Sequence, residues 1–152
     1  MVYKLLSNKI MSKKISIIGV GYVGLPLAIK LSKKNKVIGY DSSKIRIYDL
    51  KNKNDIYKDK ILKKNKNLKF SNDVNDIKNS DLFIITVPTP VDNKNKPNLK
   101  YLKEASKIVG KSLKKKSIII YESTVYPGCT EEVCVPILEK NSKLKYKRDF
   151  NC

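Results

Sequence analysis

The sequence predicts an α/β fold built as a doubly wound parallel sheet, and three observations lead to this prediction. Short runs rich in isoleucine and valine alternate with helical patterns along the chain, which is the order of right-handed crossover units. These runs are continuously apolar, as expected for strands buried on both faces. The first run leads into three closely spaced glycines, "GVGYVG". Together they indicate a Rossmann-like sheet of about five to six strands in a single domain.

Each element follows from its local pattern. The expected strands are 13–19, 36–41, 68–70, 81–87 and 116–122. The expected helices are 22–34, 43–50, 74–79, 99–113 and a last one from about Pro127 to Lys140. Pro136 lies inside the last helix and should bend it or mark an early break.

The remaining segments are expected to be irregular. Residues 1–12 are interpreted as an N-terminal extension of a domain spanning 13–152, and because Met11 lies just before the first strand, a misplaced start is the alternative for the first ten residues. Residues 51–67 have little periodicity and are expected to form an exposed loop. The basic tail 141–152 is too short for another full crossover unit.

The glycine-rich stretch has the spacing of a dinucleotide-binding loop. Gly19, Gly21 and Gly24 would serve the tight turn, the approach of the backbone to a pyrophosphate, and the packing of helix against strand. The following helix would direct its free N–H groups and the positive end of its dipole at the phosphates. Tight turns without a ligand also use glycines, so the loop alone is a weak signal.

The second strand strengthens the signal, because it ends in "VIGYD" with Asp41 at the spacing expected for the acid that binds the adenosine ribose. A carboxylate there would repel the 2′-phosphate of NADP, so NAD is the expected cofactor. Ser42, Lys44 and Arg46 could cradle that phosphate, which leaves NADP disfavoured without excluding it.

Two further loops follow expected strands, at the edge of the sheet where ligands of α/β folds bind. In "VPTPVD" (87–92), Pro88 and Pro90 would stiffen the loop and hold Thr89 near a ribose or nicotinamide, although two prolines also simply end a strand. In "ESTVYPG" (122–128), Ser123 and Thr124 offer hydroxyls near the nicotinamide end, and Glu122 could supply charge. The alternative is that Ser123 or Thr124 simply caps the start of the following helix, since both residue types are common at that position.

Composition limits the possible functions. The chain has 33 Lys and Arg against 14 Asp and Glu, a formal net charge of +19. The lysines are spread along the whole chain, which favours a general compositional bias over a nucleic-acid surface. Histidine is absent, which removes many hydrolase mechanisms. Cys129, Cys134 and Cys152 lack paired metal-site spacing, so we expect free thiols and no metal.

No run of the sequence approaches the roughly 18 apolar residues of a membrane span, and the first ten residues lack the apolar core of a signal peptide. The sequence therefore predicts a cytoplasmic protein.

With "GVGYVGLPLA", "VPTPVD" and "YESTVYPGCTEEVCVPILE" together, the sequence resembles the N-terminal NAD-binding domain of the UDP-glucose/GDP-mannose dehydrogenase family over nearly all of residues 13–150. "GYVGLPLA" and "ESTVYPG" are more similar to the branch that oxidises UDP-N-acetylhexosamines, as in Vi-type capsule and O-antigen pathways. The resemblance implies a two-fold NAD-dependent oxidation of a sugar C6 alcohol to a carboxylate, through an aldehyde and a cysteine thioester.

The resemblance also implies roles for particular residues. Thr124 matches the hydroxyl residue beside the reacting C6. The expected cofactor-binding residues are Gly19, Val20, Gly21, Tyr22, Val23, Gly24, Asp41, Arg46, Val87, Thr89, Pro90 and Ser123. In the family, the catalytic cysteine, the lysine, most of the UDP-sugar site and the helix that forms the homodimer follow "KRDF". We therefore expect these 152 residues to be the NAD-binding portion of an enzyme and to be inactive by themselves. A homodimer is expected only for the full-length relative.

Two alternatives stay open on the sequence. One is a stand-alone basic Rossmann module that binds NAD or nucleic acid, and the other is a different NAD-dependent dehydrogenase, such as a hydroxyacid enzyme. The sequence also predicts poor solubility, since a sheet without its sixth strand would leave the edge of the fifth strand unpaired.

Overall fold

The computed structural model describes residues 14–52, 65–91 and 97–152. The expected N-terminal extension (1–12), most of the expected loop 51–67, and Asp92 lie outside these residues. The strands are β1 (Lys14–Ile18), β2 (Lys36–Tyr40), β3 (Leu68–Ser71), β4 (Leu82–Ile85) and β5 (Ile118–Tyr121). The helices are α2 (Gly24–Ser32), α3 (Lys44–Asn52), α4 (Val74–Ile77), α5 (Lys100–Gly110), the π-helical turn η2 (Thr130–Cys134) and α6 (Val135–Ser142).

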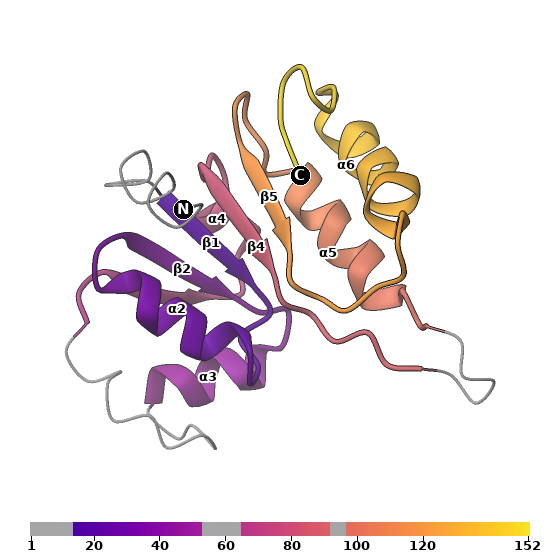
Figure 1. Ribbon diagram of the computed structural model, residues 1–152. Coiled ribbons are helices and arrows are strands. Elements are labelled where there is room, and N and C mark those ends of the chain that lie inside the picture. Colours follow the sequence, from indigo (N-terminus) through magenta and orange to yellow (C-terminus); the bar gives the residue numbers. More distant parts are fainter. Residues whose placement is uncertain (1–13, 53–64, 92–96) are drawn as a thin grey trace, which may run out of the picture.

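The five strands form one parallel sheet in the order β3-β2-β1-β4-β5 (Figure 1). Ile15 of β1 pairs with Val37 of β2 on one side and with Leu82 of β4 on the other. The chain runs outward from β1 to β3 and then returns to the other side of β1. This reversal makes the crevice between the carboxyl ends of β1 and β4 the topological switch point, where ligands of open α/β sheets bind. The predicted doubly wound parallel sheet is confirmed.

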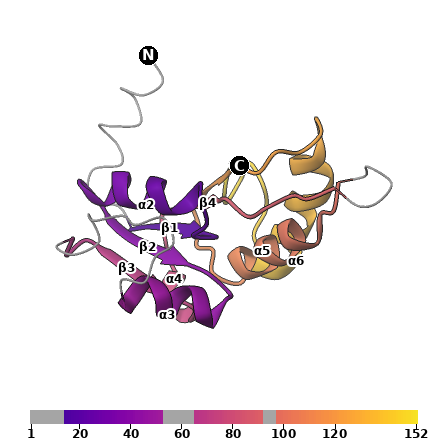
Figure 2. The same ribbon diagram turned by 90° about the horizontal axis from the view of Figure 1, so that it is seen from below.

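The core has two layers, because successive residues of β1 point to opposite faces of the sheet. Ile15 and Ile17 belong to a cluster with Ala28 of α2, whereas Ile18 packs in a cluster with Leu102 of α5. Figures 1 and 2 show α5 and α6 together on one side of the molecule, away from α2 and α3. In the described part of the chain, no helix has the length and apolar character needed to cross a membrane.

The last helix starts differently from the expected one. Its first part is the π-helical turn η2, in which the Val135 amide donates to the Thr130 carbonyl across five residues. Pro136 falls in the first turn of α6, where a missing N–H is tolerated. The proline therefore marks the change from π to α geometry.

The tail contacts the sheet more closely than its length suggested. Asn151 forms a parallel bridge with Ile118, in which the Ile119 amide donates to the Asn151 carbonyl at 2.8 Å. Phe150 is buried in the cluster that holds α5 and α6. The edge of β5 is therefore paired at its amino end, where the sequence predicted an open edge.

Asp149 fixes the tight turn before this bridge. Its carboxylate accepts hydrogen bonds from the Lys145 amide at 2.9 Å and from the Arg148 guanidinium at 2.9 Å. Its own carbonyl accepts from the Lys116 amide, two residues before β5. The guanidinium and the amide both favour the ionised carboxylate, and they hold the pKa of Asp149 below its usual range.

This lowered pKa predicts a pH-dependent stability. A carboxyl group whose pKa is lower in the folded state stabilises the fold above its unfolded pKa of about 3.9, and this contribution is lost as the pH falls through the folded value. Asp149→Asn should therefore lower the free energy of unfolding at pH 7, and the difference from wild type should shrink by pH 3. Urea titrations at both pH values would measure it, and a difference that is equal at both would contradict the assignment.

Candidate functional site

Two of the three loop glycines are required by the packing of the protein itself. Gly19 follows β1 with a φ of +94°, a conformation that favours glycine. A Cβ on Gly24, at the start of α2, would overlap the Gly19 carbonyl oxygen and lie 2.5 Å from the Thr86 hydroxyl oxygen. These positions fix the turn and the close packing of α2 against β1.

Gly21 has no such reason to be glycine. A Cβ there would meet no atom of the described residues within 4 Å apart from its chain neighbours, and its φ is outside the left-handed region. In the described residues, the amides of Gly21, Tyr22 and Val23 donate to no acceptor. The side chains of Tyr22 and Val23 are 74% and 42% exposed. The loop thus leaves room, and free donors at a helix N-terminus, for an anionic group to approach its backbone.

Asp41 lies next to this loop at the carboxyl end of β2. One carboxylate oxygen accepts a hydrogen bond from the Val20 amide at 3.0 Å, and the other accepts from the Ser43 amide at 2.9 Å. Each oxygen keeps a further lone pair for a hydroxyl donor. The structure thus brings the predicted acid and the glycine loop into direct contact, and it adds an anchoring role that the sequence did not indicate.

Arg46 holds the loop from α3, where its Nε donates to the Val20 carbonyl at 3.0 Å. The buried Val20 is therefore fixed at its amide by Asp41 and at its carbonyl by Arg46.

The loops after β4 and β5 are tied to each other by two hydrogen bonds. The Ser123 hydroxyl donates to the Val87 carbonyl at 2.6 Å, and the Thr89 hydroxyl donates to the Thr124 carbonyl at 2.7 Å. Pro90 accepts at its carbonyl from the Asn98 amide at 2.7 Å, just before α5. The expected residues of both loops therefore lie together beside the switch point.

Thr124 differs from its neighbours. It is exposed, and in the described residues its hydroxyl makes no hydrogen bond, while its backbone is held by Thr89. This hydroxyl is thus free to contact a bound molecule. Glu122, two residues earlier, is exposed, and its amide donates to the Ile85 carbonyl at 2.9 Å.

Thr86 is a site residue that sequence reasoning missed. It directly follows β4, and its hydroxyl donates to the Gly19 carbonyl at 2.6 Å across the switch point. The only signal in the sequence was a threonine at the end of a buried apolar run, and its importance depends on β4 lying next to β1.

The three thiols lie elsewhere. Cys129 and Cys134 are fully buried in the core beside α5, and burial raises the pKa of the Cys134 thiol, which keeps it protonated. Neither is placed as a nucleophile. Cys152 is exposed at the last position of the chain.

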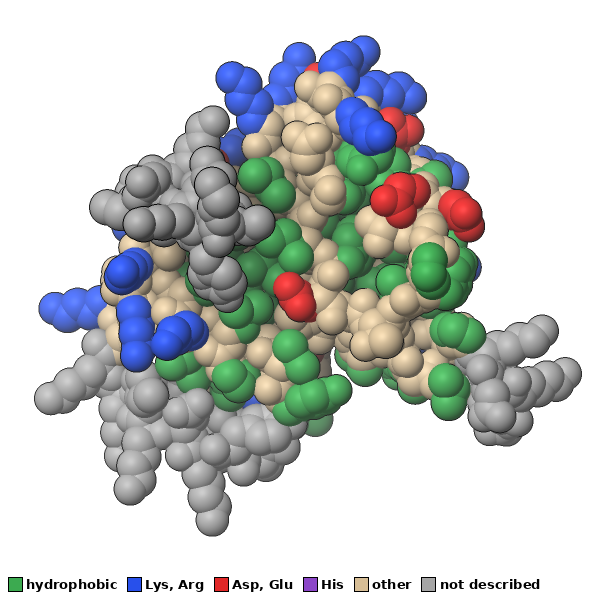
Figure 3. All heavy atoms as spheres, viewed as in Figure 1, with side chains coloured by type: hydrophobic (Ala, Val, Ile, Leu, Met, Phe, Trp, Pro, Cys, Tyr) green, Lys and Arg blue, Asp and Glu red, His purple; other side chains and the backbone are tan. Residues whose placement is uncertain are grey.

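The charged surface lies away from the glycine loop on the face shown in Figure 3. Lys and Arg side chains gather at the upper end, over the segment after α6 and the loop before β5, and a second group lies at the left of the view, while uncharged surface predominates near the carboxyl ends of the strands. The basic residues of these two segments are Lys111, Lys114, Lys115, Lys116, Lys143, Lys145, Lys147 and Arg148. Any partner attracted by them would bind apart from the loop.

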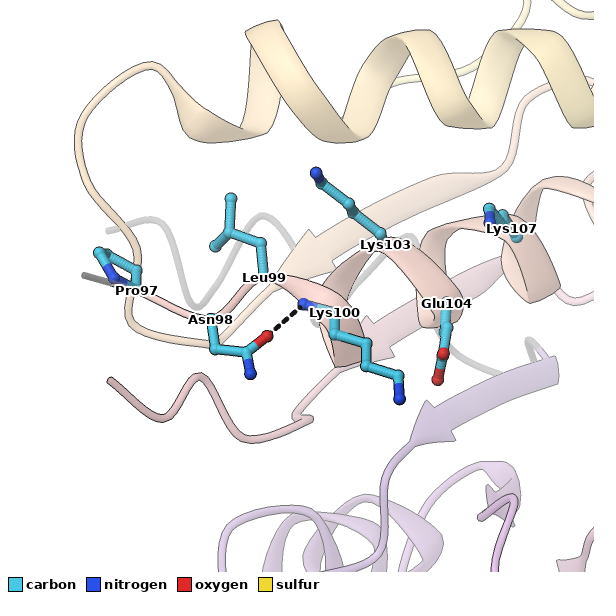
Figure 4. Close-up of a pocket in the computed structure, with 7 residues that line it drawn as sticks. All are labelled: Pro97, Asn98, Leu99, Lys100, Lys103, Glu104 and Lys107. Atoms are coloured by element: carbon cyan, nitrogen blue, oxygen red, sulfur yellow. Dashed lines mark hydrogen bonds between the residues drawn. The ribbon is translucent and has the colours of Figure 1, made fainter. Parts of the chain in front are cut away.

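A shallow groove runs along α5 (Figure 4). Its described lining is Pro97, Asn98, Leu99, Lys100, Lys103, Glu104 and Lys107, all from α5 or just before it. The Asn98 side chain accepts from the Lys100 amide at 3.0 Å and caps the helix. Without a second wall among the described residues, this groove offers no comparable binding geometry.

The residues at the switch point fit a dinucleotide. An open glycine with free amides suits a pyrophosphate, and a carboxylate at the end of β2 suits a ribose. The hydroxyl of Thr124 lies at the other side of the switch point, where the second nucleoside of such a dinucleotide would lie.

Comparison with known proteins agrees with this geometry. Residues 13–152 match the model of the UDP-glucose/GDP-mannose dehydrogenase family, NAD binding domain. The chain is 47% identical over 144 residues to Protein CapL of Staphylococcus aureus, covering 92% of this chain and 34% of that protein. It is 47% identical over 140 residues to UDP-N-acetyl-D-glucosamine 6-dehydrogenase of Salmonella typhi, covering 90% and 33%.

The fold matches a solved structure of the same class. The UDP-D-ManNAc dehydrogenase of Pyrococcus horikoshii superposes with a TM-score of 0.82 at 34% identity, covering 90% of this chain and 34% of that one. The chain thus spans about a third of the length of the relatives it matches.

Proposed function

Since this chain belongs to the UDP-glucose/GDP-mannose dehydrogenase family and matches its NAD-binding domain, we propose that it is the cofactor-binding portion of a UDP-N-acetylhexosamine 6-dehydrogenase. Two relatives that are named UDP-N-acetyl-D-glucosamine 6-dehydrogenase support a UDP-N-acetylhexosamine as the class of substrate. The reaction would convert the C6 alcohol to a uronate, with NAD accepting a hydride in each of two oxidations.

The open Gly21 is the observation that supports cofactor binding at this loop. The pyrophosphate would lie against the amides of Gly21, Tyr22 and Val23, with the N-terminus of α2 behind them. Asp41 would accept hydrogen bonds from the adenosine ribose, using the lone pairs left by Val20 and Ser43. The remaining contacts come from the two tied loops, through Val87, Thr89, Pro90 and Ser123.

Thr124 is our proposed catalytic residue. Its backbone is fixed by Thr89, and its hydroxyl has no hydrogen-bond partner among the described residues, so it can hold the reacting C6 oxygen or a water at the nicotinamide end. The buried thiols of Cys129 and Cys134 cannot form a thioester with a substrate at this edge of the sheet. We therefore expect the 152-residue polypeptide to bind NAD without oxidising a UDP-sugar.

The proposal predicts a preference for NAD over NADP of at least about tenfold in Kd, because the Asp41 carboxylate would repel the 2′-phosphate. Isothermal titration calorimetry with both cofactors would measure it. Asp41→Ser should reduce the ratio of the Kd for NADP to the Kd for NAD. The ratio is the informative quantity, because losing the anchor of Val20 weakens both cofactors together.

Two outcomes would contradict the proposal. A folded wild-type chain that binds neither cofactor would show that the glycine loop serves only the turn. An unchanged ratio in Asp41→Ser would separate Asp41 from cofactor choice.

A further inference from the structure

Thr86 joins the two strands that flank the switch point. Its amide donates to the Ile18 carbonyl at 2.9 Å and continues the pairing of β4 with β1. Its hydroxyl then donates to the Gly19 carbonyl at 2.6 Å, with the Ile18 carbonyl farther away at 3.2 Å. The side chain thus contacts the first turn of the glycine loop from the neighbouring strand.

The Gly19–Val20 peptide is therefore held at both of its polar groups. Its carbonyl accepts from Thr86, and its N–H donates to Asp41. In a planar trans peptide the carbonyl and the N–H point in opposite directions. Two side chains from β4 and β2 thus set the rotation of this peptide about the chain.

The orientation of the next peptide follows from the same geometry. The Val20 carbonyl accepts from Arg46, so the N–H of Gly21 points the opposite way. That N–H has no acceptor in the described residues, and a Cβ on the same residue would meet none of their atoms within 4 Å apart from its chain neighbours. The amide that faces the opening is thus aimed by contacts one residue earlier.

Glycine makes this support necessary. Gly19 has a φ of +94°, and glycine can rotate between conformations that other residues avoid. Without a donor for its carbonyl, the Gly19–Val20 peptide could turn away from Asp41, and the Gly21 amide would turn with it.

We propose that Thr86 is a positioning residue for cofactor binding, which fixes the Gly19 carbonyl and thereby aims the Gly21 amide at the pyrophosphate. This inference rests on the proposed function of the loop. Thr86 does not itself contact the cofactor in this proposal.

The test compares Thr86→Val, which keeps the shape of the side chain and removes the hydroxyl, with Thr86→Ser, which keeps the hydroxyl. Affinity for NAD is measured by calorimetry, and affinity for adenosine, which has no phosphate, by NMR titration. We expect the valine variant to weaken NAD binding about tenfold, the effect of one hydrogen bond of ordinary strength. Adenosine binding should stay within about twofold of wild type, and serine should restore NAD binding.

Each result decides between the claims. If wild type binds NAD and Thr86→Val binds it equally well, the positioning role is wrong while the proposed function stands. If valine weakens NAD and adenosine by the same factor, Thr86 acts on the whole fold and the positioning role is again wrong. If wild type fails to bind NAD, the proposed function itself fails.

Discussion

Replacing Gly21 with alanine is expected to weaken NAD binding at least about 100-fold without lowering the stability of the fold. Among the described residues other than its two chain neighbours, no atom lies within 4 Å of the added methyl group, and the φ of this residue is outside the left-handed region that favours glycine. Replacing glycine by alanine lowers the conformational entropy of the unfolded chain, so the free energy of unfolding should stay the same or rise by about 0.4–1 kcal/mol. The methyl group would instead occupy the space against the backbone that a pyrophosphate needs.

Gly24→Ala is the matched control, and for this variant a loss of stability is expected in addition to a loss of NAD binding. Its Cβ would collide with the Gly19 carbonyl oxygen and the Thr86 hydroxyl, and backbone atoms cannot move aside cheaply. Overpacking of this kind costs about 1–3 kcal/mol or more, and the displaced turn would lose NAD as well. Thermal unfolding with calorimetry on both variants would measure the two effects.

The pair separates ligand contact from architecture. Unchanged NAD binding in Gly21→Ala would place the pyrophosphate elsewhere and remove the main support for the proposed site. Equal losses of stability in both variants would show that Gly21 is also a packing glycine.

The sequence could place the glycine loop and Asp41 next to each other because their signals are local. The glycine spacing, the apolar strand before it and Asp41 at the end of the next strand lie within 30 residues or so, and the structure joins them through the hydrogen bond from Val20 to Asp41.

Contacts between distant segments could not be predicted in the same way. Thr86 acts on Gly19 only because β4 returns beside β1, and Thr89 reaches Thr124 only because β5 then lies beside β4. The π-helical turn before α6 was missed for another reason. Its apolar pattern is that of an ordinary helix, and a single proline in the sequence does not show whether the turn before it forms α-helical or π-helical hydrogen bonds.

The tail was misjudged for the same physical reason. Residues 145–151 have little periodicity, and their order comes from Asp149 within the turn and from Asn151 on the edge of β5. The pairing of Asn151 with Ile118, more than 30 residues earlier, cannot be predicted from the residue pattern around Asn151.

The second large effect is expected at Phe150, whose replacement by alanine should destabilise the fold by about 3–5 kcal/mol. This ring is 1% exposed in the cluster that contains α5 and α6, and it packs against Tyr146 at a centroid distance of 5.9 Å. Such a loss is a large part of the roughly 5–15 kcal/mol that holds a domain folded. Urea unfolding followed by circular dichroism would measure it.

Tyr48→Ala provides the comparison, since it truncates an aromatic side chain that is 64% exposed on α3. It should change stability by no more than about 0.5 kcal/mol, so burial and not ring size explains any difference. A loss below about 1 kcal/mol for Phe150→Ala would mean that the tail contributes little to the fold. The edge of β5 would then open readily, and the aggregation expected of an unpaired edge should appear in the wild-type chain. A loss in the expected range makes the tail part of the core, which covers that edge where Asn151 meets Ile118.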